Sequence, residues 1–228
     1  LYHGPDGQVH EQRAELVVVA CNGVGTPRLL LNSKSKTFPG GLANRNGMVG
    51  KNLMFHPLTG VAGVFDEPML GHEGPMACSI LSQEFYETDP NRGFVRGYGL
   101  HSGRSTTPMT YALGGYGIDN PIPWGAEHRE IMDNIYPYLA GLTIVSEDLP
   151  EQHNCVTLDP DLTDSDGIPA PKITYRLGGN TRKMLRHGEE QAKEILLAAG
   201  AKKVLSKNDD KVWWRAGWHQ MGTCRMGD

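Results

Sequence analysis

The sequence predicts a mixed fold, of class α/β plus α+β, in which a strand–turn–helix unit precedes a region of antiparallel sheet flanked by helices. The run Glu15 to Ala20 is short, β-branched and free of polar breaks, which is typical of a strand covered on both faces in a parallel sheet. Further strand candidates, separated by turns rich in glycine and proline, follow it. From about Thr181 to Ala199, apolar residues recur at three- and four-residue spacing, which indicates one long amphipathic helix.

The N-terminal region supplies the strand–turn–helix unit. Its first ten residues predict a hairpin around the turn Gly4-Pro5-Asp6-Gly7. The strand at 15–20 ends at the turn Asn22-Gly23-Val24-Gly25, after which Thr26 is expected to cap a helix and Pro27 to occupy its first position. A helix start after a strand can hold an anion or a cofactor edge. An ordinary packing unit has the same pattern, so both interpretations remain open at this point.

The residues after Pro57 predict an antiparallel sheet with few helices. Residues 36–50 are rich in Gly, Pro and Asn and predict a loop. Residues 101–125 predict a long loop whose aromatic side chains either hold it to the core or face a substrate. The acidic run 161–167 lacks the EF-hand spacing and predicts a solvated turn. The expected strands are 59–65, 93–99, 139–145 and 154–160; the aromatic residues are Tyr111, Tyr116 and Trp124; a short helix is expected at 127–134.

For the chain of 228 residues, composition excludes some classes of partner. The formal net charge is -4 and the sequence pI is about 6.1, so nucleic acid is not an expected partner. No apolar run approaches the roughly 18 residues that span a bilayer. The four cysteines are widely scattered, which predicts separate thiols and favours a reducing compartment such as the cytoplasm. Because the first residue is Leu1 rather than a methionine, an upstream portion is expected to be missing.

The last eleven residues, Trp218 to Asp228, have the composition of a functional site. His219 is the side chain best suited to accept and return a proton near neutral pH. Gly222 and Gly227 permit backbone conformations that other residues avoid, and Arg225 adds a fixed charge. Spacing alone leaves two interpretations of His219 open: a catalytic base, or a hydrogen-bonded structural residue.

Three segments resemble motifs of one known family. His219-Gln220-Met221-Gly222-Thr223-Cys224-Arg225-Met226-Gly227 resembles the His-x-x-Gly-Thr-x-Arg-Met-Gly signature of the glucose-methanol-choline (GMC) flavin oxidoreductases. Residues 17–33 are similar to the strand–turn–helix segment of that family. Residues 49–57 resemble its Val-Gly-x-Asn-Leu-x-x-His-Pro segment. All three occur in the family order.

The resemblance implies an FAD cofactor and a division of the chain. Residues 1–57 are expected to form part of an FAD-binding Rossmann-like domain, residues 58–210 a substrate-binding domain, and residues 211–228 a return to the FAD-binding domain. The residues that it places beside FAD are Ala20, Cys21, Asn22, Gly23, Asn52, Gly222 and Thr223. His56 is expected either to contact the flavin or to order its own loop through hydrogen bonds to the backbone, and the ordering role is favoured. The Gly-x-Gly-x-x-Gly turn that receives a dinucleotide pyrophosphate does not occur in the sequence and is expected upstream. A second active-site His or Asn is expected beyond Asp228.

The function that the resemblance implies is oxidation of an alcohol to an aldehyde or ketone, by hydride transfer to FAD with His219 as the base. A choline dehydrogenase-like dehydrogenase is expected rather than an oxidase, with a small alcohol as substrate; quinone, cytochrome and oxygen all remain open as electron acceptors. One alternative is a catalytically incomplete structural or interaction fragment, and the chain alone is expected to be inactive. Another is a metal-dependent hydrolase using His56, His219 and the acidic turn, which no ligand spacing favours.

Overall fold

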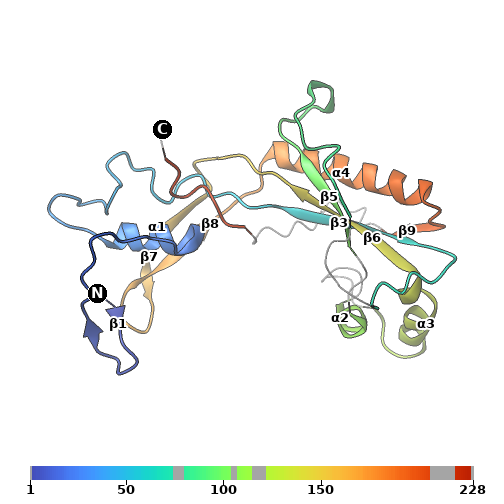
Figure 1. Cartoon of the computed structure of the whole chain (residues 1–228), viewed down its shortest axis with the longest axis horizontal. Helices are drawn as coiled ribbons and strands as arrows, with labels where there is room; N and C mark the ends of the chain where they lie inside the picture. Colours follow the sequence, from blue (N-terminus) through green and yellow to red (C-terminus); the bar gives the residue numbers. More distant parts are fainter. Residues whose placement is uncertain (1, 74–79, 104–106, 115–121, 206–218, 227–228) are drawn as a thin grey trace.

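The computed structural model describes residues 2–73, 80–103, 107–114, 122–205 and 219–226. Figure 1 shows an elongated molecule. A five-stranded antiparallel sheet and the long helix α4 (Gly179–Ala198) lie at one end. Helix α1 (Asn22–Asn32) lies at the other end, with the hairpin of β7 (Cys155–Thr163) and β8 (Pro169–Thr174). The segment 219–226 returns to the end that holds α1. Helices packed on antiparallel sheet confirm the α+β part of the predicted class. The predicted residues Cys78, Tyr116, Trp218 and Gly227 lie outside the described residues.

The five-stranded sheet has the strand order β4-β5-β6-β3-β9. Strand β3 pairs with β6 along the whole length of β3, from Leu58 opposite Val145 to Val64 opposite Leu139. Side chains on a strand alternate between the two faces. Each face therefore carries its own apolar cluster. The strands are β3 Leu58–Val64, β4 Ile80–Ser82, β5 Tyr98–Gly103, β6 Leu139–Ser146 and β9 Lys203–Leu205.

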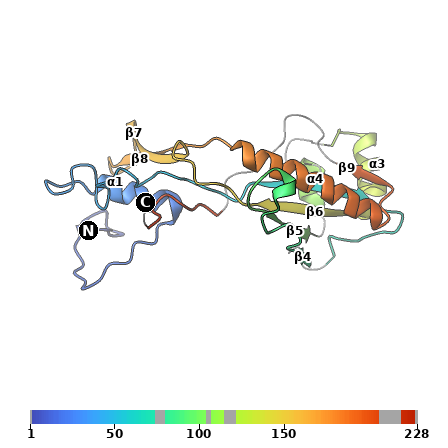
Figure 2. The same ribbon diagram turned by 90° about the horizontal axis from the view of Figure 1, so that it is seen from above.

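Helix α4, Gly179–Ala198, covers one face of this sheet, and Figure 2 shows it running along the strands. Val61 of β3 belongs to the apolar cluster beneath it. The helix approaches closely at Gly188, where a Cβ atom would lie 2.7 Å from Cγ2 of Ile144. The sequence prediction of this helix, and of its end near Gly200 (φ 101°), is confirmed. The residues of α4 that are buried are Thr181, Met184, Leu185, Gly188, Ala192 and Leu196.

A second apolar cluster, which includes Ala62 of β3 and Leu139 of β6, lies beneath the shorter helices. Tyr111 and Tyr136 pack there with ring centroids 4.9 Å apart, so Tyr111 holds its segment to the core. Trp124 is 84% exposed and stacks on His128 instead. The elements on this side are α2 Pro108–Gly114, α3 Ala126–Asn134 and the 3-10 turn η2 Tyr136–Tyr138. Another 3-10 turn, η1, spans Pro90–Arg92.

At the other end, α1 (Asn22–Asn32) packs against the hairpin of β7 (Cys155–Thr163) and β8 (Pro169–Thr174). Arg28 joins them: its guanidinium donates to the Asp164 carboxylate at 2.7 Å and to the carbonyl oxygen of Pro169 at 2.8 Å. The hydrogen bond from Arg28 lowers the pKa of Asp164. The predicted N-terminal hairpin is also present, as β1 (Tyr2–His3) and β2 (Val9–His10).

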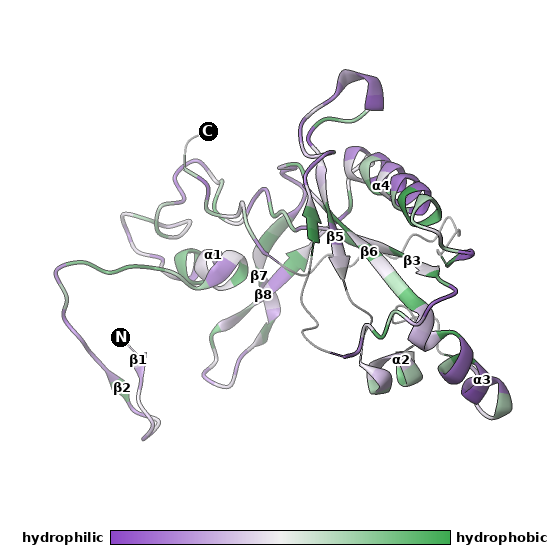
Figure 3. Ribbon diagram, turned by 45° about the vertical axis from the view of Figure 1, so that its right-hand side comes forward, coloured by the Kyte–Doolittle hydropathy of each residue, from purple (hydrophilic) through white to green (hydrophobic). Residues whose placement is uncertain are grey.

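The predicted strand at 15–20 is wrong for the structure described. These residues form no strand, and Leu16, Val17 and Val18 are 75–81% exposed. An apolar run of this kind becomes a strand when neighbouring strands pair with it and cover its faces. None of the described strands does so. Figure 3 shows the segment as a green stretch, leading to α1 apart from the packed elements.

Three other boundaries differ from the sequence prediction. Helix α1 begins at Asn22 rather than after Thr26, and Oδ1 of Asn22 accepts from the N–H of Val24 in its first turn. Strand β5 begins at Tyr98 and not at residue 93, since Gly93 (φ 72°) and Arg96 (φ 68°) have left-handed backbone. Helix α4 is preceded by Gly178 without a side-chain cap, because Asn180 bonds the backbone of Val95 instead.

Some elements had no counterpart in the prediction. Strands β9 and β4 lie in stretches for which no strand was predicted, and α2 lies in one predicted to be a loop. Among the described residues, no helix is long and apolar enough to cross a bilayer. The three cysteines within the described ranges, Cys21, Cys155 and Cys224, are free thiols.

Candidate active site

The C-terminal segment meets the loop after Gly50 in a short antiparallel pairing. Met54 and Met221 form an isolated bridge, in which each N–H donates to the other residue's carbonyl oxygen, at 2.9 and 3.1 Å. In an antiparallel register, two residues forward on one chain correspond to two residues back on the other. The register of this bridge therefore sets His56 opposite His219.

His56 and His219 contact each other through their rings. Their Nδ1 atoms are 2.8 Å apart, and the ring planes meet at 83° with centroids separated by 5.0 Å. An N···N contact of this length holds one hydrogen, so one ring donates its Nδ1–H and the other accepts. The contact engages Nδ1 of both rings and neither Nε2.

The backbone at His219 is in the left-handed region, with φ 57°. This conformation is uncommon for residues other than glycine, and such positions cluster at functional sites. His219 is exposed and His56 is half-buried. The bridge beside His219 and the contact with His56 hold an imidazole at the surface in an unfavourable backbone conformation.

The start of α1 packs against the segment that carries His219. A Cβ atom on Gly23 would lie 2.8 Å from the carbonyl carbon and oxygen of Gln220, so only glycine fits there without a shift. The buried hydroxyl of Thr223 donates to the carbonyl oxygen of Gly23 at 2.7 Å. Two of the residues predicted from separate motifs are thus hydrogen-bonded to each other.

Asn22 closes the first turn of α1. Its backbone is left-handed, with φ 59°, and its Oδ1 accepts from the N–H groups of Val24 at 2.8 Å and Gly25 at 3.1 Å. These two donors are therefore occupied by the protein itself. Ala20 and Cys21 lie on the exposed stretch directly before this turn.

Asn52 and Gly222 form the third contact between the motifs. Asn52 is buried with φ 62°, and Gly222 has φ 90°. A Cβ atom on Gly222 would overlap the carbonyl oxygen of Asn52, so glycine is required. Gly50 adds another contact, since its N–H donates to the carbonyl oxygen of Thr223 at 2.8 Å. We call the contacts that join the C-terminal segment to the start of α1 and to residues 50–56 the junction.

Burial lowers the pKa of His56, and the neighbouring His219 lowers it further. The negative charges of Glu147 and Asp148, just after β6, act in the opposite direction. A lowered pKa keeps the His56 ring neutral at neutral pH. A neutral ring has one nitrogen that accepts a hydrogen bond and one that donates.

The structure brings together six of the eight predicted site residues through contacts between the motifs or at the cap of α1. Ala20 and Cys21 lie next to this set on the chain. The contact between His56 and His219 was not predicted, because the two roles expected of His56 were contact with the flavin and, preferentially, ordering of its own loop. The six residues are Asn22, Gly23, Asn52, His219, Gly222 and Thr223.

Comparison with known proteins places these motifs in a family. Residues 150–228 match the model of the GMC oxidoreductase family. The chain is 42% identical over 224 residues, 97% of its length, to 2-methyl-1,2-propanediol dehydrogenase from Mycolicibacterium austroafricanum. The chain belongs to the GMC oxidoreductase family.

Other relatives of this GMC chain include both dehydrogenases and oxidases. It is 29% identical to the fructose dehydrogenase large subunit from Gluconobacter japonicus, over 89% of the chain. It is 26% identical to paromamine 6'-oxidase from Streptomyces fradiae, over 96% of the chain. The chain covers 40%, 36% and 37% of the lengths of these three relatives, so it corresponds to less than half of each.

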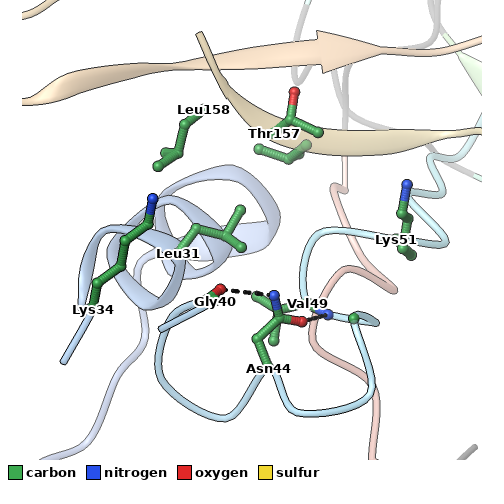
Figure 4. Close-up of a pocket in the computed structure, with 10 residues that line it drawn as sticks. Leu31, Lys34, Gly40, Asn44, Val49, Lys51, Thr157 and Leu158 are labelled. Atoms are coloured by element: carbon green, nitrogen blue, oxygen red, sulfur yellow. Dashed lines mark hydrogen bonds between the residues drawn. The ribbon is translucent and has the colours of Figure 1, made fainter. Parts of the chain in front are cut away.

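The GMC chain also has a pocket of about 280 Å³ near the C-terminal end of α1 (Figure 4). Asn44 shapes one wall: its amide donates to the Gly40 carbonyl oxygen at 2.9 Å, and its Oδ1 accepts from the N–H of Val49 at 3.0 Å. The pocket contains none of the predicted site residues. Its lining is Leu31, Lys34, Gly40, Asn44, Gly47, Val49, Lys51, Val156, Thr157 and Leu158.

Proposed function

We propose that this chain is part of an FAD-dependent enzyme that oxidises a small alcohol to an aldehyde or ketone, with His219 as the base. The relatives are named for 2-methyl-1,2-propanediol, fructose and paromamine, which supports a CH–OH group as the reacting unit. The relative at 42% identity is named a dehydrogenase, which favours dehydrogenase over oxidase activity. Quinone, cytochrome and oxygen are the candidate electron acceptors.

The residues at the junction fit the ring end of FAD better than its diphosphate. Asn22 already occupies two N–H groups of the first turn of α1, which are the donors that a diphosphate would need there. An exposed, uncharged edge formed by Ala20, Cys21 and Asn22 suits a planar ring. Asn52, Gly222 and Thr223 would shape the turn that carries His219 beside it.

The proposed division of the chain follows from this assignment. Residues 1–57 and 211–228 would contribute to a Rossmann-like FAD-binding domain, and residues 58–210 would form the substrate-binding domain. The exposed apolar run at 16–19 supports the first part, because such a run is suited to a buried strand of a parallel sheet. FAD, when bound, supplies the hydride acceptor.

The contact between His56 and His219 is the observation that carries the proposed role of His219. It engages Nδ1 of His219 at 2.8 Å, so Nε2 is the nitrogen that meets a substrate. In the reaction, the alcohol O–H bond breaks and its proton passes to Nε2. The carbinol C–H bond breaks with its electron pair leaving as hydride, and the C=O bond forms. General-base help of this kind typically contributes about 10²–10⁴-fold.

The test is the variant His219→Ala in the full-length flavoprotein. Anaerobic stopped-flow should show flavin reduction by the alcohol slowed about 10²–10⁴-fold, with FAD still bound. His128→Ala, a half-buried histidine of α3 outside the candidate site, is the matched control and should reduce at the parental rate.

Two results would contradict the proposal. A His219→Ala protein that keeps its flavin and reduces it at the parental rate would remove His219 from the chemistry. A full-length parent protein that binds no FAD would favour the structural or interaction fragment instead.

A further inference from the structure

We propose that His56 is a positioning residue, whose Nδ1 accepts the Nδ1–H of His219 and thereby leaves Nε2 of His219 free to take the proton of the alcohol. This inference rests on the proposed role of His219 as the base. It adds a requirement that the family motif alone does not contain, since His56 acts through His219 without touching the substrate.

The hydrogen bond has two possible directions with opposite chemical consequences. If His56 donates to Nδ1 of His219, a neutral His219 carries its own hydrogen on Nε2 and has no lone pair there for a proton. If His219 donates, its Nε2 carries the lone pair and is a base. The 2.8 Å contact therefore decides whether His219 accepts a proton or donates one.

The charges around His56 favour the second direction. Glu147 and Asp148 place negative charge near its ring, and because His219 engages Nδ1, a hydrogen that His56 carries on Nε2 would be the one available to that charge. Asp148 is held in place, since its carboxylate accepts from the hydroxyl of Tyr175 at 2.6 Å and from that of Thr181 at 3.0 Å. His56 with its hydrogen on Nε2 presents Nδ1 as the acceptor for His219.

The backbone around His56 is fixed on both sides. Before it, the N–H of Leu53 donates to the carbonyl oxygen of Asn154 at 2.9 Å. After it, the Pro57 carbonyl oxygen accepts from both the N–H of buried Ser146, at 3.1 Å, and its hydroxyl, at 2.9 Å. The backbone beside His56 is thus bonded to the end of β6, whereas His219 lies on a turn and has a left-handed backbone. Because its backbone is held on both sides, His56 orients the ring of His219.

The test compares His56→Ala with His56→Asn in the full-length flavoprotein. An asparagine Oδ1 occupies roughly the position of a histidine Nδ1 and can accept the same hydrogen. Loss of a hydrogen bond to a group that becomes charged should slow flavin reduction about 10- to 100-fold in His56→Ala. The Asn variant should recover most of this rate, and His128→Ala should match the parent.

One further measurement separates positioning from a general loss of structure. With ¹⁵N-labelled histidine, long-range ¹H–¹⁵N spectra should show the hydrogen of His219 on Nδ1 in the parent and on Nε2 to a substantial extent in His56→Ala. The charged groups near His56 include Glu147 and Asp148, so each variant is compared at one pH and constant ionic strength.

The outcomes distinguish this inference from the proposed function. Parental rate and an unchanged His219 tautomer in His56→Ala would overturn the inference, and so would a parent spectrum with the His219 hydrogen on Nε2. Neither result would contradict the proposed function if flavin reduction in the His219→Ala variant remains slow. Conversely, a parental rate in His219→Ala would overturn the proposed function, while the tautomer would still report the direction of the hydrogen bond.

Discussion

The hydroxyl of Thr223 donates a 2.7 Å hydrogen bond to the carbonyl oxygen of Gly23, a residue 200 positions earlier in the chain. The bond joins the turn that carries His219 to the start of α1. Because Thr223 is 2% exposed, the bond is shielded from water. The position of the His219 turn therefore depends on two small residues that have no chemical role of their own.

Thr223→Val should loosen this junction. Valine has nearly the same shape but no hydroxyl, so the Gly23 carbonyl oxygen loses its partner in a buried position. Such a loss costs about 1–3 kcal/mol, and denaturant unfolding should show it. Thr223→Ser keeps the hydroxyl and should lie close to the parent. If the Thr223→Val and Thr223→Ser variants are equally stable, the hydrogen bond contributes nothing to the stability of the junction.

Gly23→Ala should displace the turn by a steric route. The added Cβ would stand 2.8 Å from the Gln220 carbonyl group, which is backbone and cannot rotate away. Overpacking of this kind costs about 1–3 kcal/mol, and flavin reduction should slow because His219 follows Gln220. Gly179→Ala is the matched control, since its Cβ would meet no atom within 4 Å. Equal effects of the two alanines on reduction would show that the turn is not held at Gly23.

The half-buried carboxyl of Glu189, a residue of α4, should make the stability of the protein depend on pH. Burial raises the pKa of this carboxyl above its ordinary value of 4.5, although the Thr59 hydroxyl donates to it. The folded protein therefore binds the proton more tightly than the unfolded chain. This contribution to stability is fully present below the ordinary value and is lost as pH rises through the raised pKa.

Glu189→Gln removes this titration while keeping an oxygen that can accept from Thr59. Urea unfolding should find the variant more stable than the parent at neutral pH, and the difference should shrink as the pH falls toward 4.5, the ordinary value of the carboxyl. The exposed neighbour Glu190→Gln serves as the control. A constant difference between parent and Glu189→Gln at every pH would mean that the carboxyl does not titrate in this range.

Local periodicity was sufficient to predict some elements and not others. Helix α4 and strands β3 and β6 follow patterns that lie within a single stretch of sequence, and the structure confirms them. The strand at 15–20 failed because a strand depends on partners that its own residues do not specify. Strand β9 was missed for the same reason: it is three residues long and exists through its pairing with β3.

The candidate site could be predicted as motifs, but not as an arrangement. His219, Asn52 and Gly23 were selected by resemblance, and the structure joins their segments. The contact with His56 could not be found in this way, because the two histidines are 163 positions apart and nothing local encodes their pairing. A signal was present in hindsight: each histidine lies two residues from a methionine that forms the bridge.

That bridge also determines which changes of chain length the site tolerates. His56 lies two residues after Met54, and His219 lies two residues before Met221. The number of residues in each of these two stretches therefore determines which side chain faces His56. Deleting one residue between Met54 and His56, or between His219 and Met221, would shift one side of the register and turn a histidine to the opposite face. The site is therefore expected to tolerate substitutions at Phe55 or Gln220 better than a single insertion or deletion beside them.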